Sequence, residues 1–334
     1  MLDFDIQGTG TALLAITGGL VLLIGSGELL VRGSVSLAKQ FGIPRIIIGM
    51  TIVAFGTSVP ELFVGIQSVR SGSPGLAIGN VVGSNIANVL LVLGLPSIIF
   101  PTVVKETGIR RNTVMMILFS GLFIWMSVDG GLTFSDGVTL VFLLSGFLAY
   151  QAHHAVKSPG DVELIDELGE LEGVSGGRDS GLKIFVFILV GLIGLPLGAN
   201  SLVSGSVFVA HSLGVDEALI GLSLVAIGTS LPELAITAVA AFRRHAGVAI
   251  GNVIGSNIMN ILAVMGISIL FAGDAGIPVK ANFVDFHLWV MLLSSALLIP
   301  FAFTHRPISR TMGLIFLVFY ISYIAYIFKN GLMG

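Results

Sequence analysis

The chain has 334 residues, of which 54% are hydrophobic and only 10% are charged, and its mean hydropathy is +1.01. Soluble proteins carry about 25% charged residues, so this composition excludes a soluble globular protein and indicates one that crosses a membrane several times. The net charge is only −3 and comes without a basic patch, which argues against a nucleic-acid partner. There is no cysteine, and this excludes disulfides and thiolate metal sites.

Ten apolar segments follow one another along the chain and predict an all-α polytopic membrane protein. Each meets or approaches the length of about 20 residues that a helix needs to cross the bilayer. The first segment follows an acidic start without a small-residue cleavage site, so we interpret it as a span and not as a signal peptide. In chain order the predicted spans are Thr11–Val31, Ile46–Val69, Leu76–Phe100, Thr113–Val128, Val138–Ala152, Ile184–Ala210, Ala218–Phe242, Val248–Ala272, Phe283–Phe303 and Met312–Phe328.

A polar stretch divides these segments into two groups of five. We therefore predict a first five-helix half over residues 1–152, an acidic loop over 153–183 and a second five-helix half over 184–334. The loop lacks the Gly-centred oxygen spacing of an EF-hand, so we interpret it as a solvated linker and not as a regulatory calcium site. Its acidic residues are Asp161, Glu163, Asp166, Glu167, Glu170, Glu172 and Asp179.

The distribution of Lys and Arg predicts how the chain is oriented. With alternating spans, twelve Lys and Arg residues fall on the side of the acidic loop, whereas only Arg70, Lys280 and Lys329 fall on the other side. Loops rich in Lys and Arg stay in the cytoplasm. We therefore predict a multi-pass protein of the cell (inner or plasma) membrane, with both termini extracytoplasmic and the acidic loop cytoplasmic.

The sequence repeats itself at an offset of 172 residues. "GTSVPEL" (56–62) aligns with "GTSLPEL" (228–234), and "AIGNVVGSNIANVLLVLG" (77–94) aligns with "AIGNVIGSNIMNILAVMG" (249–266). From Ile48 to Gly94, 24 of 47 positions match, which indicates an internal duplication. Because each half has an odd number of spans, the second half should be inverted relative to the first, as in many secondary transporters. The repeated segments cover about 46–100 and 218–272, and we expect Glu61 and Glu233 to meet near the bilayer midplane.

The repeated motifs gather oxygen atoms at a place where a membrane helix should have none. Proline lacks an N–H and crowds the carbonyl four residues earlier, so Pro60 should free carbonyls around Ala54 to Thr57 from helical hydrogen bonds. Two carboxylates surrounded by neutral oxygens suit a hard cation, because Ca²⁺ accepts 6–8 oxygen ligands in flexible geometry. The candidate ligands are Ala54, Thr57, Ser58, Glu61, Asn80, Ser84 and Asn88 in the first repeat, and Ala226, Thr229, Ser230, Glu233, Asn252, Ser256 and Asn260 in the second.

These motifs resemble the two α-repeats of the Ca²⁺/cation antiporter superfamily, in particular its prokaryotic sodium/calcium exchanger family. The resemblance implies that Glu61 and Glu233 are shared ligands of Ca²⁺, together with the main-chain carbonyls of Thr57 and Thr229. It implies sliding of the first and sixth helices across a static core. It also implies flanking Na⁺ sites at Ala54, Ser58 and Ser84 and at Ala226, Ser230 and Ser256, with Asn88 and Asn260 lining the centre. Many family members have Asp in place of Asn260. If that Asp is protonated, Asn is a near-isostere and little changes, whereas if it is ionised, this centre holds less charge and the ion preference or stoichiometry could differ.

We therefore expect a secondary active antiporter that exchanges Na⁺ for Ca²⁺ by alternating access, with no cofactor and no covalent chemistry. One alternative is H⁺/Ca²⁺ exchange on the same scaffold, in which Glu61 or Glu233 would carry the proton. Another is a cation channel with Glu at its constriction. An intramembrane enzyme is disfavoured, because the chain has no G-x-S-x-G elbow and no HExxH pair.

Overall fold

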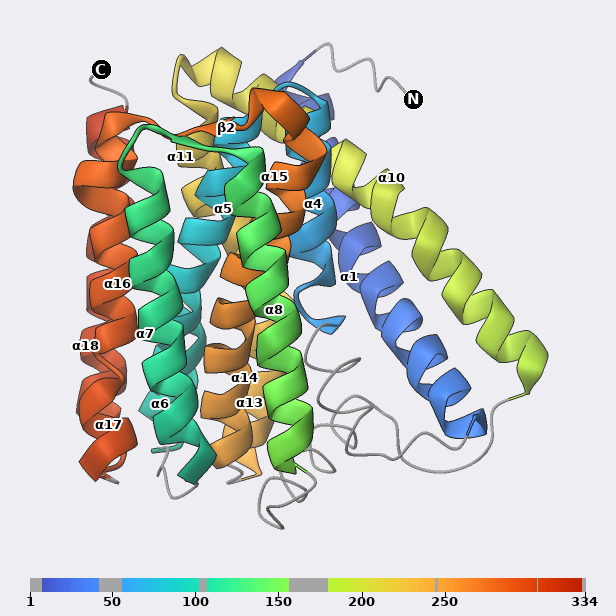
Figure 1. The fold of residues 1–334 in the computed structure, drawn as a ribbon. Coiled ribbons are helices and arrows are strands. Elements are labelled where there is room, and N and C mark those ends of the chain that lie inside the picture. Colours follow the sequence, from blue (N-terminus) through green and yellow to red (C-terminus); the bar gives the residue numbers. More distant parts are fainter. Residues whose placement is uncertain are drawn as a thin grey trace.

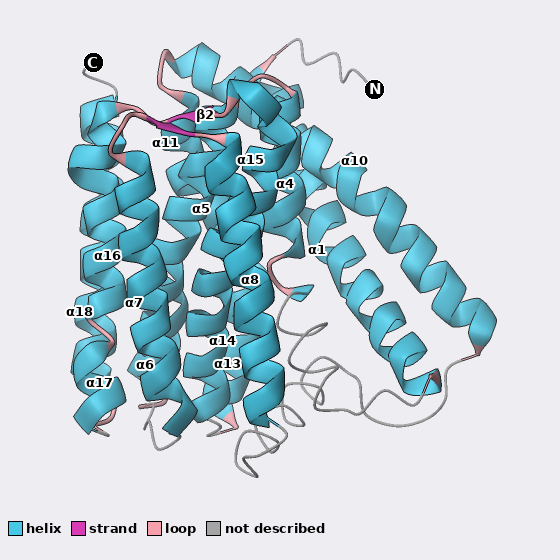
Figure 2. Cartoon of the chain, viewed as in Figure 1, coloured by secondary structure: helices cyan, strands magenta, loops and turns pink. Residues whose placement is uncertain are grey.

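The computed structural model describes residues 8–41, 56–101, 107–155, 180–243, 246–304 and 306–331. These parts of the chain are almost entirely helical, and one short antiparallel ribbon joins β1 to β2 (Figure 2). The helical fold agrees with the all-α prediction.

The first half contains the following elements: α1 (Thr9–Gln40), α4 (Val59–Arg70), α5 (Pro74–Ala87), η2 (Asn88–Leu93), α6 (Gly94–Ile99), α7 (Thr107–Ser127), β1 (Gly131–Leu132) and α8 (Phe134–Ala155). The second half begins with α10 (Gly181–Leu213), α11 (Glu217–Ile220), η3 (Gly221–Val225), α12 (Ala226–Thr229), α13 (Leu231–Phe242), α14 (Ala246–Met259) and η4 (Asn260–Met265). It continues with α15 (Gly266–Ala272), the 3₁₀ turn η5 (Gly273–Ala275), β2 (Ile277–Pro278), η6 (Phe283–His287), α16 (Leu288–Ala296), α17 (Ile299–Thr304) and α18 (Arg310–Gly331). The segments η2, η3, η4 and η6 are π-helical.

Within the described residues, seven helical segments are long and apolar enough to cross a membrane. An eighth is formed if the bent pair 217–229 and 231–242 counts as one broken span. The predicted fourth span lies in α7, whose first turns carry Arg110 and Arg111 and which is not among the seven. Part of the predicted second span lies outside the described residues, and α4 is its described end. A protein with several membrane-spanning helices is therefore confirmed, while the count of ten stays a prediction.

The helix boundaries repeat with the same spacing as the sequence. The bounds of α13 are those of α4 displaced by 172 positions, and α14 and η4 relate to α5 and η2 in the same way. A π-helix at the same place in both halves shows that duplicated residues impose the same backbone irregularity. Such π-helical segments occur frequently at functional sites.

The helices α1 and α10 form a pair that leans away from the rest of the bundle (Figure 1). Glycines bring their backbones into contact. A Cβ added to Gly19 would lie 2.6 Å from the backbone nitrogen of Leu202, and one added to Gly191 would lie 2.6 Å from Cβ of Leu30. No side chain fits at either position, so the contact between α1 and α10, which we call the glycine seam, depends on small residues, as helix contacts in membranes often do.

The two segments that carry the repeated Asn and Ser residues form the centre of the bundle. In the most apolar window of 74–99, 94% of the residues are buried, and in that of 246–275, 83% are buried. The corresponding shares in the other spanning helices are 22% to 39%. These two helices are thus surrounded by protein, which is where polar side chains are tolerated in a membrane.

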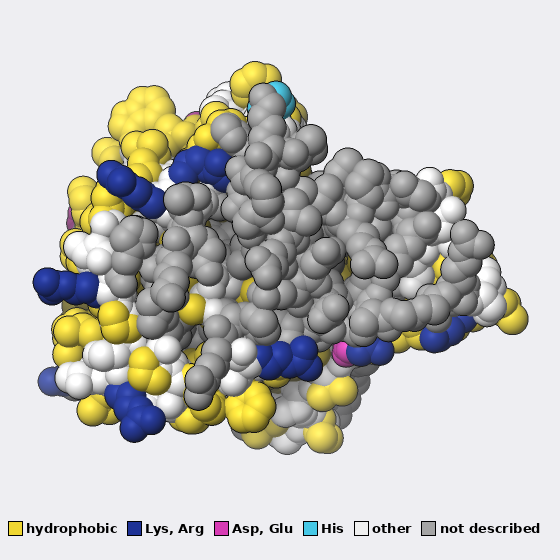
Figure 3. Space-filling view, turned by 90° about the horizontal axis from the view of Figure 1, so that it is seen from below, with side chains coloured by type: hydrophobic (Ala, Val, Ile, Leu, Met, Phe, Trp, Pro, Cys, Tyr) yellow, Lys and Arg dark blue, Asp and Glu magenta, His cyan; other side chains and the backbone are white. Residues whose placement is uncertain are grey.

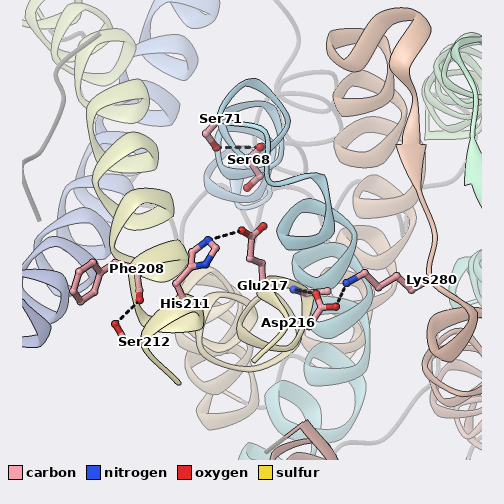
Figure 4. Close-up of polar contacts among 9 residues, drawn as sticks. Ser68, Ser71, Phe208, His211, Ser212, Asp216, Glu217 and Lys280 are labelled. Carbon is pink, nitrogen blue, oxygen red and sulfur yellow. Dashed lines mark hydrogen bonds and ion pairs between the residues drawn. The ribbon is translucent and has the colours of Figure 1, made fainter. Parts of the chain in front are cut away.

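Both described ends of the chain lie at the upper end of the molecule, as does the ribbon of β1 and β2 (Figure 1). At this end His211 and Glu217 pair at 3.4 Å, and Asp216 pairs with Lys280, so the turn from α10 to α11 is tied to the segment before η6 (Figure 4). Lys and Arg side chains are visible around the rim of the lower end (Figure 3). This lower end contains the end of α8 and the start of α10, which flank the predicted cytoplasmic loop.

Candidate ion-binding site

The repeated GTS-x-PEL motifs form helix breaks with a glutamate in the first turn that follows. Proline occupies the first turn of α4 and of α13, where its missing N–H has no intrahelical acceptor to lose. At the second motif the chain bends by 45° between α12 and α13. Glu61 and Glu233 therefore lie at helix N-termini inside the bundle, where peptide dipoles stabilise negative charge.

Both glutamates are completely buried, with 0% exposure, and all four of their carboxylate oxygens lack a hydrogen-bond partner within the described parts of the chain. The two carboxylates are close enough to repel each other. Neutral hydroxyls lie nearby, and both threonine hydroxyls come from the repeat opposite to the carboxylate. Thr229 of the second repeat lies beside Glu61, and Thr57 of the first repeat and Ser256 lie beside Glu233.

The repeated motifs contain further buried oxygen atoms. The hydroxyls of Ser58, Ser84 and Ser230 are buried and have no partner among the described residues. Thr57 and Ser256 approach each other at 3.4 Å between their hydroxyls, and the Thr229 hydroxyl donates to Asn80 Oδ1 at 3.2 Å. Buried polar atoms normally find partners, so this concentration of unpaired oxygens in one place calls for a ligand.

The structure brings most of the predicted site residues together but not all of them. Ala226 is completely buried in α12, one turn before Ser230. Asn252 turns away from the centre, since its amide donates to the Glu233 carbonyl and to the Thr237 hydroxyl. Ala54 lies outside the described residues. A cavity of about 250 Å³ borders the site at Thr57 and is lined by residues of α1 and α13 and by Gly56, Thr57 and Pro60.

Four asparagines connect the two repeats, two of them at the start of the π-helical segments η2 and η4 and two of them three residues earlier. Asn88 Nδ2 donates to Asn257 Oδ1 at 3.0 Å, and Asn260 Nδ2 donates to Asn85 Oδ1 at 3.1 Å. Asn260 is the equivalent of Asn88, and Asn85 is the equivalent of Asn257, so the second bond is the first with the two repeats exchanged. A two-fold axis between the repeats requires such a pair of bonds. The prediction named Asn88 and Asn260 but missed Asn85 and Asn257. The signal was available, because Asn85 lies in the same repeated GSN motif, three residues before Asn88.

The arrangement has the chemistry of a cation site. In the described residues no Lys, Arg or His forms an ion pair with either glutamate, and no cluster of three His, Cys, Asp or Glu side chains occurs. Two buried carboxylates without a counter-charge are costly, and a bound cation removes that cost. Because every candidate ligand atom is oxygen, the donor set suits Na⁺ or Ca²⁺ better than a soft transition metal.

Comparison with known proteins places the chain in a family. The sequence model described as sodium/calcium exchanger protein matches residues 11–152 and 183–329. The inner membrane protein YrbG of Escherichia coli is 38% identical over 78% of this chain and 79% of its own length. The sodium/calcium exchanger MaX1 of Methanosarcina acetivorans is 31% identical over 93% of this chain and 96% of its own length.

Solved structures agree with these sequence matches. The sodium-calcium exchanger NCX_Mj, soaked with Na⁺ and Sr²⁺, superposes with a TM-score of 0.64 at 32% identity and covers 95% of this chain and 99% of its own. Two of these relatives, MaX1 and NCX_Mj, are named as sodium/calcium exchangers. The chain belongs to the sodium/calcium exchanger family of cation antiporters.

Proposed function

We propose that this protein is a secondary antiporter that exchanges Na⁺ for Ca²⁺ by alternating access. The observation that carries the proposal is the pair of buried carboxylates, Glu61 and Glu233, which have no counter-charge and are surrounded by neutral oxygens. Two carboxylates neutralise one Ca²⁺ or two Na⁺, so the same site can hold either ion but not both in full. Mutually exclusive binding of this kind is what couples two fluxes in an exchanger.

We assign the roles within the site by position. Glu61 and Glu233 bind Ca²⁺ together with the carbonyls of Thr57 and Thr229. The flanking Na⁺ sites use Ala54, Ser58 and Ser84 on one side and Ala226, Ser230 and Ser256 on the other, while Asn88 and Asn260 line the centre. The positions of Thr57 next to Glu233 and of Thr229 next to Glu61 support this assignment, because each carboxylate is next to a threonine hydroxyl of the opposite repeat.

The architecture that goes with this function is a pair of inverted five-helix repeats, 1–152 and 184–334, joined by the acidic loop 153–183. The displacement of helix bounds by 172 positions and the interchanged asparagine bonds support it. We place the protein in the cell membrane with both termini outside. The close glycine seam between α1 and α10 supports movement of these two helices as one body against the bundle.

Uptake of ⁴⁵Ca²⁺ into proteoliposomes loaded with Na⁺, at fixed pH and clamped voltage, tests the proposal against choline-loaded controls. We expect uptake only when Na⁺ is inside. Uptake that ignores Na⁺ but follows a pH gradient would assign the protein to H⁺/Ca²⁺ exchange. Uptake indifferent to both, without saturable counterflow, would identify a channel and overturn the antiporter.

A further inference from the structure

Four asparagine side chains, Asn85, Asn88, Asn257 and Asn260, form what we call the amide cluster, between the two central helices. All four are buried, with 0% to 1% exposure. From their bonding we infer that Asn85 and Asn257 are positioning residues, which turn the carboxamide oxygens of Asn260 and Asn88 toward the ions. This inference rests on the proposed function, since it assigns a task to residues beside that site.

The orientation of Asn85 and Asn257 follows from contacts with the main chain. Asn257 Nδ2 lies 3.1 Å from the Asn85 carbonyl oxygen, and Asn85 Nδ2 lies 3.4 Å from the Asn257 carbonyl oxygen. A carbonyl oxygen only accepts, so the atom facing it must be the NH₂ group. The opposite amide orientation would put two acceptors in contact. Each Oδ1 must therefore point away from the facing main chain.

The orientation of Asn85 and Asn257 in turn determines the orientation of the amides of Asn260 and Asn88. Because Asn257 and Asn85 present Oδ1, the groups that face them, on Asn88 and Asn260, must be NH₂. The oxygens of Asn88 and Asn260 then point elsewhere, and both are buried without a partner among the described residues. Two main-chain carbonyls thus determine, through two intermediate amides, where two free oxygens are presented.

The two free oxygens belong to segments that pack against the helices of the glutamates. Asn88 opens η2, which packs against α13, the helix of Glu233, and Asn260 opens η4, which packs against α4, the helix of Glu61. Amide oxygens are good ligands for hard cations. A cluster with only a structural task would pair all its polar atoms, since an unpaired buried acceptor costs stability. This cluster instead leaves unpaired two oxygens that an ion or its water can use.

The test is a set of double-mutant cycles on transport in proteoliposomes, with the apparent KM for Na⁺ and for Ca²⁺ as the readout. We expect Asn257→Leu and Asn88→Leu each to raise the KM of at least one ion about tenfold, the effect of one hydrogen-bonding group. The double variant should stay near tenfold, because both changes remove the same oriented oxygen. Asn85→Leu with Asn260→Leu should behave in the same way.

The non-partner pair Asn257→Leu with Asn260→Leu disturbs both oxygens, so its effects should multiply. Asn112→Leu on α7, outside the site, is the matched control and should leave both KM values unchanged. Asn→Ser variants serve where a Leu variant does not fold. Multiplied effects within the partner pairs, or a wild-type KM in Asn257→Leu, would overturn the inference. Failure of the wild type to exchange Na⁺ for Ca²⁺ would instead refute the proposed function.

Discussion

Glu61 and Glu233 are completely buried, and no basic side chain of the described residues pairs with either of them. An uncompensated carboxylate in such a place costs several kcal/mol, so the residue type has a use other than packing. Thr57, Thr229 and Ser256 next to the carboxylates supply dipoles without neutralising the charge. The negative charges of Glu61 and Glu233 are thus available to a cation that binds reversibly.

Replacing either glutamate by glutamine should abolish exchange. Glu61→Gln and Glu233→Gln keep the shape but remove one negative charge, and losing a buried charged partner costs about 3–5 kcal/mol, which is more than hundredfold in affinity. ⁴⁵Ca²⁺ uptake by purified, Na⁺-loaded variants measures the loss. Glu217→Gln, at the upper end of the molecule, is the control and should transport like the wild type. Wild-type ⁴⁵Ca²⁺ uptake by either site variant would contradict the proposal that both glutamates bind Ca²⁺.

Asn260 is the position at which this chain departs from the resemblance, and the amide cluster shows what an Asp would have to do there. Asn260 donates its NH₂ to Asn85 Oδ1 at 3.1 Å. An ionised Asp has no proton to donate, so it would face that oxygen as a second acceptor. Only a protonated Asp keeps the contact. Asparagine provides the donor permanently and leaves the centre with the charges of the two glutamates alone.

At the scale of elements, the contact between α1 and α10 decides which residues tolerate change. Gly18 and Gly19 are neighbours on α1, but only Gly19 faces α10. A Cβ on Gly19 would lie 2.6 Å from the backbone of Leu202, whereas one on Gly18 would have no atom within 4 Å. The neighbouring glycines therefore do different things, one as a packing surface and the other as an exposed helical position.

Substitution of these two glycines by alanine should affect thermal stability differently. Alanine favours a helix over glycine by about 1 kcal/mol, so Gly18→Ala should leave thermal stability unchanged or raise it slightly. Gly19→Ala should lower stability by about 1–3 kcal/mol through overpacking, and should slow exchange because the pair no longer fits together. Thermal unfolding of the purified variants, with transport rates in proteoliposomes, checks both. Equal behaviour of the two variants would contradict the packing of α1 on α10.

At the scale of the whole molecule, the orientation in the membrane stays a prediction, which rests on where the charged residues lie. The described ends of the chain share one end of the molecule with Asp216 and Lys280, and the flanks of the acidic loop lie at the opposite end. Exposed Lys and Arg side chains are visible around the rim of that opposite end (Figure 3). Under the positive-inside rule we therefore expect this end to face the cytoplasm.

The absence of native cysteine makes this orientation easy to test with single cysteines. Ser212 is exposed at the upper end, and Thr304 is exposed at the lower end. In intact cells a membrane-impermeant maleimide should label Ser212→Cys and spare Thr304→Cys, and permeabilisation should make both react. Labelling of Thr304→Cys alone in intact cells would show that the molecule is inserted the other way round.

The class of the protein, the duplication and the residues proposed for the site could be predicted from the sequence alone. Hydropathy, the 172-residue repeat and the two PEL motifs are local patterns, and local patterns suffice to find helices, breaks and buried charge. The hydrogen-bond partners of the repeated asparagines could be found only in the folded chain. Asn252 and Asn80 have equivalent places in the repeat, but Asn80 meets Thr229 across the bundle while Asn252 bonds to its own repeat. The roles of Asn85 and Asn257 were likewise hidden, because an amide's orientation depends on the facing carbonyl, which belongs to a helix 172 residues away.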